Sequence, residues 1–103
     1  MFSQIQKRDG RIVDFDATKI TDAIFAAAKA VGGDDREIAK DLTNQVLDCL
    51  QEKFGTRLFT VEDVQDVVEK VLIENGRART AKAYILYRDK RTRIREGRSD
   101  LMQ

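Results

Sequence analysis

The sequence predicts an α+β fold that is mostly α, in which an N-terminal β-hairpin lies on a bundle of four helices. Three observations carry this prediction. An Asp9-Gly10 pair stands between two short β-prone runs, apolar residues recur at helical spacing through the rest of the chain, and Gly or Asp residues separate the helical stretches. The chain has 103 residues and no proline, which fits a single compact domain covering 1–103.

The hairpin is expected over about residues 4–15. Asp-Gly between alternating apolar residues is a strong hairpin signal, because a type I′ turn needs positive φ at both central positions. Asp tolerates that conformation and Gly adopts it freely. A two-stranded ribbon is only marginally stable alone, so this hairpin must lie on another surface.

Counting outward from a two-residue turn sets the expected strand pairing. Arg8 would face Arg11, and Lys7 would face Ile12. Each face of the ribbon then carries apolar as well as polar residues, so neither is marked as the solvent side. Like charges opposite each other are mildly unfavourable in a strand pair. Either ordinary solvent exposure or a nearby polyanion would explain why Arg8 and Arg11 face each other.

The first two helices are expected at about residues 17–31 and 35–53. Both stretches carry an apolar stripe at helical spacing. The stripes are Ile20, Ile24, Ala27 and Val31 in the first helix, and Ile38, Leu42, Val46 and either Cys49 or Leu50 in the second. Gly32-Gly33 ends the first helix and Gly55 ends the second, as expected of residues that readily adopt a left-handed conformation.

The third helix, at about residues 61–75, has the clearest signals. Thr60 is a natural N-cap, and Asp63 three residues later completes a near capping box. The many valines of this stretch would also suit a strand. Charged and amide residues occupy the remaining positions in helical register, however, so a helix is expected, and Asn75-Gly76 ends it.

The fourth helix, at about residues 78–97, is apolar at first and almost wholly polar from Arg88 onward. Residues 77–98 hold nine Lys or Arg against two Asp or Glu, whereas residues 1–76 hold ten against fifteen. The last helix therefore attracts anions. On the charge run alone, phosphate binding, nucleic-acid contact and a solvated helix face all remain open.

Composition narrows the classes of function. The single cysteine, Cys49, lies within an apolar pattern and is interpreted as a buried small hydrophobe. One cysteine and no histidine leave nothing for a zinc site, so no metal site is expected. The lack of histidine also argues against hydrolytic chemistry, and the chain is small for an enzyme with a closed active site. No apolar run is long enough to span a bilayer and no secretion signal is evident, so a cytoplasmic location is expected.

Four pieces of sequence, taken in order, are similar to those of a known family. They are Lys7-Arg8-Asp9-Gly10, then Phe15-Asp16 with Lys19-Ile20, then Thr60-Val61-Glu62-Asp63-Val64-Gln65, and last Ala81-Lys82-Ala83-Tyr84-Ile85-Leu86-Tyr87-Arg88-Asp89-Lys90-Arg91. This order resembles the ATP-cone domain, the nucleotide-sensing module at the N-terminus of many ribonucleotide reductases. The third and fourth pieces are most similar to the cone of the anaerobic, class III ribonucleoside-triphosphate reductase.

The resemblance implies a hairpin lid over the four-helix bundle, with ATP or dATP held between them as an allosteric ligand, together with Mg²⁺. The family's roles give two groups of site residues. The phosphates would lie on basic side chains: Lys7, Arg8, Lys19, Lys90 and, as a weaker addition, Arg91. The adenine end would lie on Ile5, Ile20, the backbone of Val13, Thr60 and Gln65. A triphosphate of about four negative charges needs several cations, which agrees with the first group. Ile5, Val13 and Ile20 could equally be core residues.

The expected function is that of an adenine-nucleotide-binding regulatory domain of a ribonucleotide reductase, with no catalytic residues of its own. ATP and dATP would favour different arrangements against a partner and so tune deoxynucleotide supply for DNA replication. The expected partner is the catalytic domain of a reductase, in cis or in trans, or another copy of the chain in a homo-oligomer. The alternative is a small nucleotide-responsive regulator that binds nucleic acid through its basic last helix. The zinc ribbon of transcriptional repressors that share the cone has no counterpart here.

Overall fold

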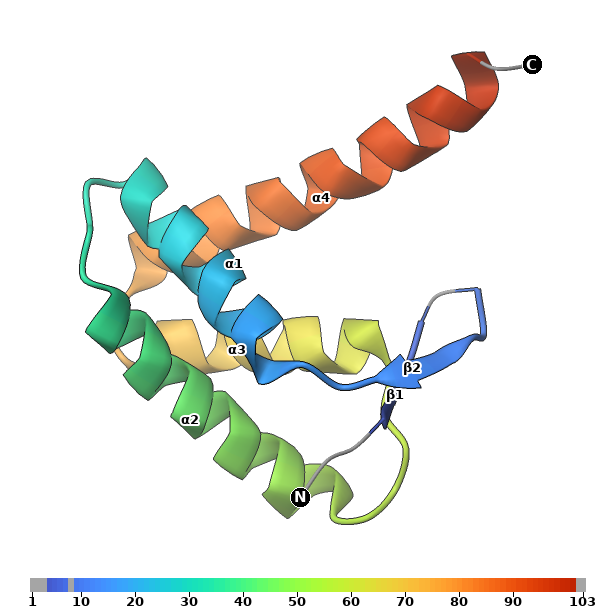
Figure 1. Cartoon of the computed structure of the whole chain (residues 1–103). Helices are drawn as coiled ribbons and strands as arrows, with labels where there is room; N and C mark the ends of the chain where they lie inside the picture. Colours follow the sequence, from blue (N-terminus) through green and yellow to red (C-terminus); the bar gives the residue numbers. More distant parts are fainter. Residues whose placement is uncertain (1–3, 8, 102–103) are drawn as a thin grey trace.

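The computed structural model describes residues 4–7 and 9–101, and the surroundings of their side chains as far as Asp89 (Figure 1). A two-stranded antiparallel hairpin is followed by four helices, which confirms the predicted fold class. The elements are β1 (Gln4–Gln6), β2 (Ile12–Asp14), α1 (Ala17–Ala30), α2 (Arg36–Phe54), α3 (Val61–Glu74) and α4 (Ala78–Leu101).

The four helices form a bundle in which each helix has two main neighbours. α1 and α3 each pack against both α2 and α4. With the exception of Val31, which is the C-cap of α1, the apolar stripes predicted from the sequence form or contact one continuous core. Its most deeply buried side chains are Phe59, Ile24, Leu50, Leu72, Val46, Val68 and Val71. Burying such side chains, at about 1.5–3 kcal/mol each, supplies the main stabilisation of the bundle.

Polar side chains fix where α1 and α3 begin. Asp16 accepts a hydrogen bond from the Thr18 backbone N–H at 3.0 Å and so caps α1. In α3 the capping box predicted from the sequence is present in both directions. The Asp63 N–H donates to the Thr60 hydroxyl oxygen at 3.0 Å, and the Thr60 N–H donates to the Asp63 carboxylate at 3.0 Å. These bonds satisfy backbone donors that the helix itself leaves unpaired.

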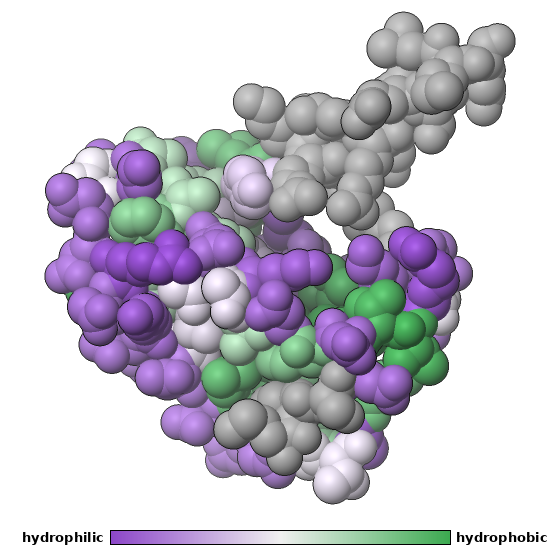
Figure 2. All heavy atoms as spheres, viewed as in Figure 1, coloured by the Kyte–Doolittle hydropathy of each residue, from purple (hydrophilic) through white to green (hydrophobic). Residues whose placement is uncertain are grey.

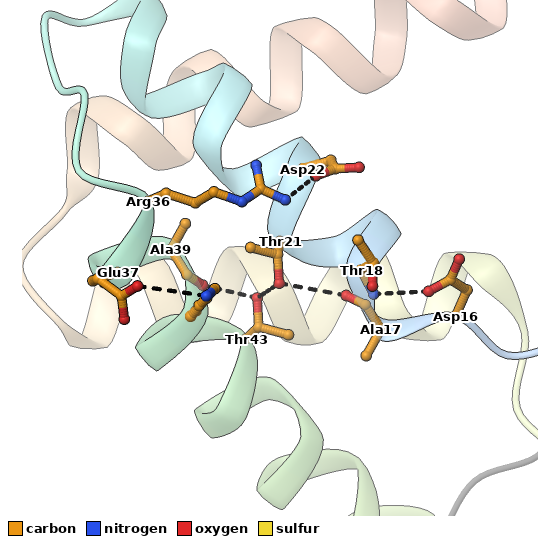
Figure 3. A network of polar contacts seen from close by, with 10 residues as sticks. Asp16, Ala17, Thr18, Thr21, Asp22, Arg36, Glu37, Ala39 and Thr43 are labelled. Carbon is orange, nitrogen blue, oxygen red and sulfur yellow. Dashed lines mark hydrogen bonds and ion pairs between the residues drawn. The ribbon is translucent and has the colours of Figure 1, made fainter.

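α1 and α2 are also joined by a polar network (Figure 3). The Thr43 hydroxyl donates to the Ala39 carbonyl at 2.8 Å, and the hydroxyl oxygens of Thr21 and Thr43 lie 2.8 Å apart. Both threonines are buried. At the surface of the same interface, Arg36 pairs with Asp22. The network connects the helix that follows the hairpin to its neighbour in the bundle.

The hairpin register expected from the sequence was wrong by one residue. Ile5 pairs with Val13 and Gln6 with Ile12. The turn is closed by the Gly10 N–H, which donates to the Lys7 carbonyl at 2.9 Å. Lys7 thus faces Arg11, and the loop holds three residues rather than two.

The longer loop has a local cause. Gly10 alone adopts positive φ, at 89°, among the described residues of the turn. Asp9 contributes its carboxylate instead, which accepts the Arg11 backbone N–H at 3.0 Å. A loop of this length with glycine at its last position is the next most common hairpin connection after the two-residue turn.

The observed register sorts the hairpin into two different faces, because shifting a strand pair by one residue changes which side chains share a face. Ile5, Val13 and Phe15 are half-buried on the inner face, and Ile5 and Phe15 pack against the core. On the other face Asp14 is exposed and Ile12 is 52 % exposed. The hairpin therefore has a definite inner side, which the predicted register lacked.

The hairpin is joined to the bundle at the start of α3. The Gln6 N–H donates to the Phe59 carbonyl at 3.0 Å, and Gln6 forms a parallel bridge with Thr60. The ring of Phe15 meets that of Phe59 edge-on, with centroids 5.5 Å apart. The surface on which the ribbon was expected to lie is thus the segment that leads into α3.

Two kinds of feature are absent from the described part of the chain. No helix there is long and apolar enough to cross a membrane. No group of three or more His, Cys, Asp or Glu side chains there is placed to hold a metal ion.

Candidate functional site

Several elements meet at the hairpin end of the bundle (Figure 1). Only Phe15 and Asp16 separate β2 from α1, so the first turn of α1 lies next to the hairpin. The Gln6–Thr60 bridge brings the start of α3 to the same end. Most of the residues that the family resemblance assigned to a nucleotide site belong to these three places.

The inner face of the hairpin gathers three of the predicted site residues. Ile5 and Val13 are direct cross-strand partners, and Lys7 follows Ile5 on the same face of β1 and its continuation. All three side chains are half-buried. Figure 2 shows hydrophobic surface at the hairpin end of the molecule with hydrophilic side chains beside it. An apolar surface bordered by a cation suits a ligand with a flat apolar part and an anionic part.

The hairpin turn carries an ion pair that sequence reasoning missed. The Asp9 carboxylate accepts the Arg11 backbone N–H at 3.0 Å and the Arg11 Nε–H at 2.7 Å. The backbone hydrogen bond, with further contributions from the Arg11 guanidinium and the charge of Lys7, lowers the pKa of Asp9 below its usual value. Asp9 and Arg11 are two positions apart in the sequence, but this spacing predicts an ion pair only once the loop is known to hold three residues.

Lys19 and Ile20, in the first turns of α1, differ in exposure. Lys19 is exposed, close to the two-residue segment that joins β2 to α1. Ile20 is 7 % exposed and belongs to the core, so only the edge of its side chain is open to a ligand. The sequence left open whether Ile20 is a core residue or borders the ligand. Its packing supports the role of a core residue.

Thr60 and Gln65 lie in the first turns of α3, and both are half-buried. The Thr60 oxygen already accepts the Asp63 N–H, so its hydroxyl proton is what it can offer to another acceptor. Glu62 and Asp63 place two carboxylates in the same helical turn. Their charge disfavours phosphate here, and this end of the site better suits an uncharged base.

α4 is tied to α3 through Arg88. Its guanidinium pairs with Glu69 and lies 3.6 Å from the Asp66 carboxylate. One turn earlier, Tyr84 is 5 % exposed, and burial raises the pKa of its hydroxyl to about 12. The charge of Arg88 is thus neutralised within the protein, although Arg88 belongs to the basic run of the last helix that the sequence predicted to attract anions.

The pairing of Arg88 also indicates where the next turn of α4 lies. α3 and α4 run in opposite directions, because only three residues join them. Lys90 and Arg91 belong to the next turn of α4, beyond the contact of Arg88 with Asp66. The side chains of these two residues lie outside the described part of the structure, as does all of Arg8.

Together the fold and the site define a small α+β module, in which a hairpin with a basic, partly apolar inner face lies against helix starts. A profile described as "ATP cone domain" matches residues 3–93. The chain belongs to the ATP-cone domain family, as its sequence motifs predicted.

The relatives of this chain are ribonucleotide reductases of several kinds. It is 42 % identical over 101 residues to the vitamin B12-dependent ribonucleoside-diphosphate reductase of Thermoplasma acidophilum, which covers 93 % of this chain and 13 % of that protein. It is 35 % identical over 97 residues to the protein of the same name from Mycobacterium tuberculosis, covering 94 % of this chain and 13 % of the relative. The anaerobic ribonucleoside-triphosphate reductase of Escherichia coli is 34 % identical over 103 residues, covering 100 % of this chain and 14 % of the relative.

The resemblance to the anaerobic reductase is thus confirmed, and the B12-dependent enzymes share the same domain. The chain spans about 13–14 % of the length of these relatives. The part of the chain that matches the family, residues 3–93, is an ATP cone domain.

Proposed function

We propose that residues 1–103 form one ATP-cone domain that senses ATP and dATP for a ribonucleotide reductase. The nucleotide would lie between the inner face of the hairpin and the nearby turns of α1, α3 and α4. The observation that carries this proposal is the hairpin register, because it brings Ile5, Lys7 and Val13 to one half-buried face. ATP-cone domains bind adenine nucleotides as allosteric effectors, which supports the same assignment.

The charge distribution supports one orientation of the ligand. The triphosphate would lie toward the basic residues of the turn, of the first turn of α1 and of α4: Lys7, Arg8, Lys19, Lys90 and Arg91. The adenine would lie toward Ile5, Val13, Ile20, Thr60 and Gln65. The carboxylates of Glu62 and Asp63 repel phosphate from the start of α3, which favours this orientation over the reverse. Mg²⁺ would accompany the triphosphate and reduce its charge.

Regulation requires that ATP and dATP act differently on the same site. A ligand shifts a conformational equilibrium only by its differential affinity for the two states. The 2′ position of the ribose must therefore be coupled to the hairpin or to a surface that meets a partner. The partner we propose is the catalytic domain of a reductase in the cytoplasm, in cis or in trans, with a second copy of the cone as another contact.

Titration with nucleotides tests the proposal. ATP and dATP should stabilise the protein against heat, by about 2.7 kcal/mol at a hundredfold excess over the dissociation constant, and GTP should do so less. A short DNA duplex serves as the comparison, because the basic part of α4 could contact nucleic acid instead. Salt-sensitive DNA binding without any response to adenine nucleotides would sink the proposal.

A further inference from the structure

Arg11 is a basic residue of the hairpin that the cone motifs do not assign to the site. In the observed register it lies directly across from Lys7, whose backbone N–H donates to the Arg11 carbonyl at 2.8 Å. Cross-strand partners share one face of a ribbon, and side chains two positions apart along a strand share it too. Arg11 therefore belongs to the same face as Ile5 and Val13, the face proposed to meet the nucleotide.

Asp9 holds the Arg11 side chain in the free protein. The Arg11 Nε–H donates to Asp9 Oδ2 at 2.7 Å, and its backbone N–H donates to Oδ1 at 3.0 Å. The backbone bond keeps Asp9 within the turn. The side-chain pair is open to solvent, since the side chains of Arg11 and Asp9 are 67 % and 55 % exposed. An ion pair this exposed stabilises little, so the guanidinium can leave it while the turn stays closed.

The charges around Arg11 favour such an exchange. Lys7 and Arg11 are like charges placed opposite each other, which is unfavourable in a strand pair, and Asp9 compensates for only one of them. A triphosphate carries about four negative charges and would compensate both cations at once. The planar guanidinium presents a fork of N–H donors that can bind phosphate oxygens in pairs, whereas Asp9 accepts only its Nε–H.

We infer that Arg11 is a further phosphate-binding residue of the nucleotide site, and that it exchanges Asp9 for the triphosphate when the nucleotide binds. This inference rests on the proposed function, because it takes the inner face of the hairpin as the nucleotide site. Asp9 is then a competing anion that lowers the affinity of the hairpin for phosphate. The exchange also gives the hairpin two states that a nucleotide distinguishes.

Calorimetric titration of dATP into Arg11→Gln and Arg11→Lys tests this inference. We expect Arg11→Gln to bind dATP about tenfold more weakly, which is about 1.4 kcal/mol. Binding of dAMP should change less, because its single phosphate engages fewer cations. Arg11→Lys should recover part of the loss. Arg79→Gln is the matched control, since Arg79 is exposed in the first turn of α4, and the length of α3, about 21 Å, separates that turn from the hairpin.

A double-mutant cycle with Asp9→Asn tests the exchange itself. Asparagine keeps a side-chain oxygen for the Arg11 N–H but removes the competing charge. Asp9→Asn alone should bind dATP more tightly than the original protein, and this gain should shrink in the Arg11→Gln background.

The outcomes separate this inference from the proposed function. If Lys7→Ala loses dATP while Arg11→Gln binds it within twofold of the original protein, the site stands and the role of Arg11 is overturned. If the unmodified protein does not bind dATP at all, both proposals fail. Far-UV circular dichroism confirms in each case that the variant is folded.

Discussion

The Gln6 backbone N–H donates to the Phe59 carbonyl at 3.0 Å, which joins the hairpin to the residue just before the N-cap of α3. Phe59 is 2 % exposed and also meets the Phe15 ring after β2. Both strands of the hairpin are therefore tied to one buried residue, β1 through its backbone carbonyl and the end of β2 through its ring. A nucleotide that displaces the hairpin must either break these contacts or carry the start of α3 with it.

Replacing Lys7 with Ala should weaken dATP binding by about 10- to 100-fold. Lys7 is half-buried on the inner face of the hairpin, and a hydrogen bond to a charged group contributes about 1.5–3 kcal/mol. Isothermal titration calorimetry measures the change. Lys82→Ala, which removes an exposed cation of α4, is the control and should bind as the original protein does. Equal affinity of both variants would show that the nucleotide lies elsewhere.

Replacing Thr60 with Ala should destabilise the domain by about 1 kcal/mol, because it removes the N-cap acceptor that serves the Asp63 N–H at 3.0 Å. Urea denaturation followed by circular dichroism measures the loss. Thr60→Ser keeps the hydroxyl and should lose much less. If Thr60→Ala and Thr60→Ser were equally stable, the capping box would not contribute to the stability of α3.

The sequence was sufficient to predict the order of the elements. Helical spacing, the Thr60–Asp63 box and the glycine stops are local signals, and each acts within a few residues of the place that it marks. The hairpin was also found, but its register was not. Asp9-Gly10 suits both a two-residue and a three-residue loop, and the choice depends on which side chains the bundle buries.

The site was predictable to a smaller extent, for the same reason. Its residues came from family motifs, whereas their arrangement depends on contacts between distant segments. Arg11 shares a face with Ile5 and Lys7 only in the observed register. Arg88 looks like one more cation of a basic helix until α3 supplies Glu69 and Asp66 beside it. Such pairings join residues about twenty positions apart, and no local pattern encodes them.

Removing one hydroxyl of the Thr21–Thr43 pair should cost more than removing both. The two oxygens lie 2.8 Å apart in a buried position between α1 and α2 (Figure 3). In Thr43→Val the Thr21 hydroxyl would keep one hydrogen-bond partner, the Ala17 carbonyl. That bond is long, at 3.5 Å. We expect a loss of about 1 kcal/mol for Thr43→Val and a smaller loss for the double variant with Thr21→Val, measured by denaturation. Strictly additive losses would show that the two hydroxyls do not act as a pair.

The stability of the domain should fall at alkaline pH because of Tyr84. Burial raises the pKa of this hydroxyl to about 12 in the folded protein, against about 10 in the unfolded chain. The unfolded chain therefore loses the Tyr84 proton first as the pH rises. The contribution of the neutral hydroxyl is fully present below pH about 10 and is lost progressively between pH about 10 and 12.

Tyr84→Phe isolates this effect, because phenylalanine fills nearly the same volume and has no proton to lose. The difference in unfolding free energy between the two proteins should be constant at neutral pH. It should then shift in favour of Tyr84→Phe by about 2–3 kcal/mol as the pH passes from 10 to 12. Lysine deprotonation affects both proteins alike and cancels in the comparison. A difference that stayed constant to pH 12 would mean that the Tyr84 hydroxyl ionises as readily in the folded protein as in the unfolded one, and so that this face of α4 is open to water where it meets α3.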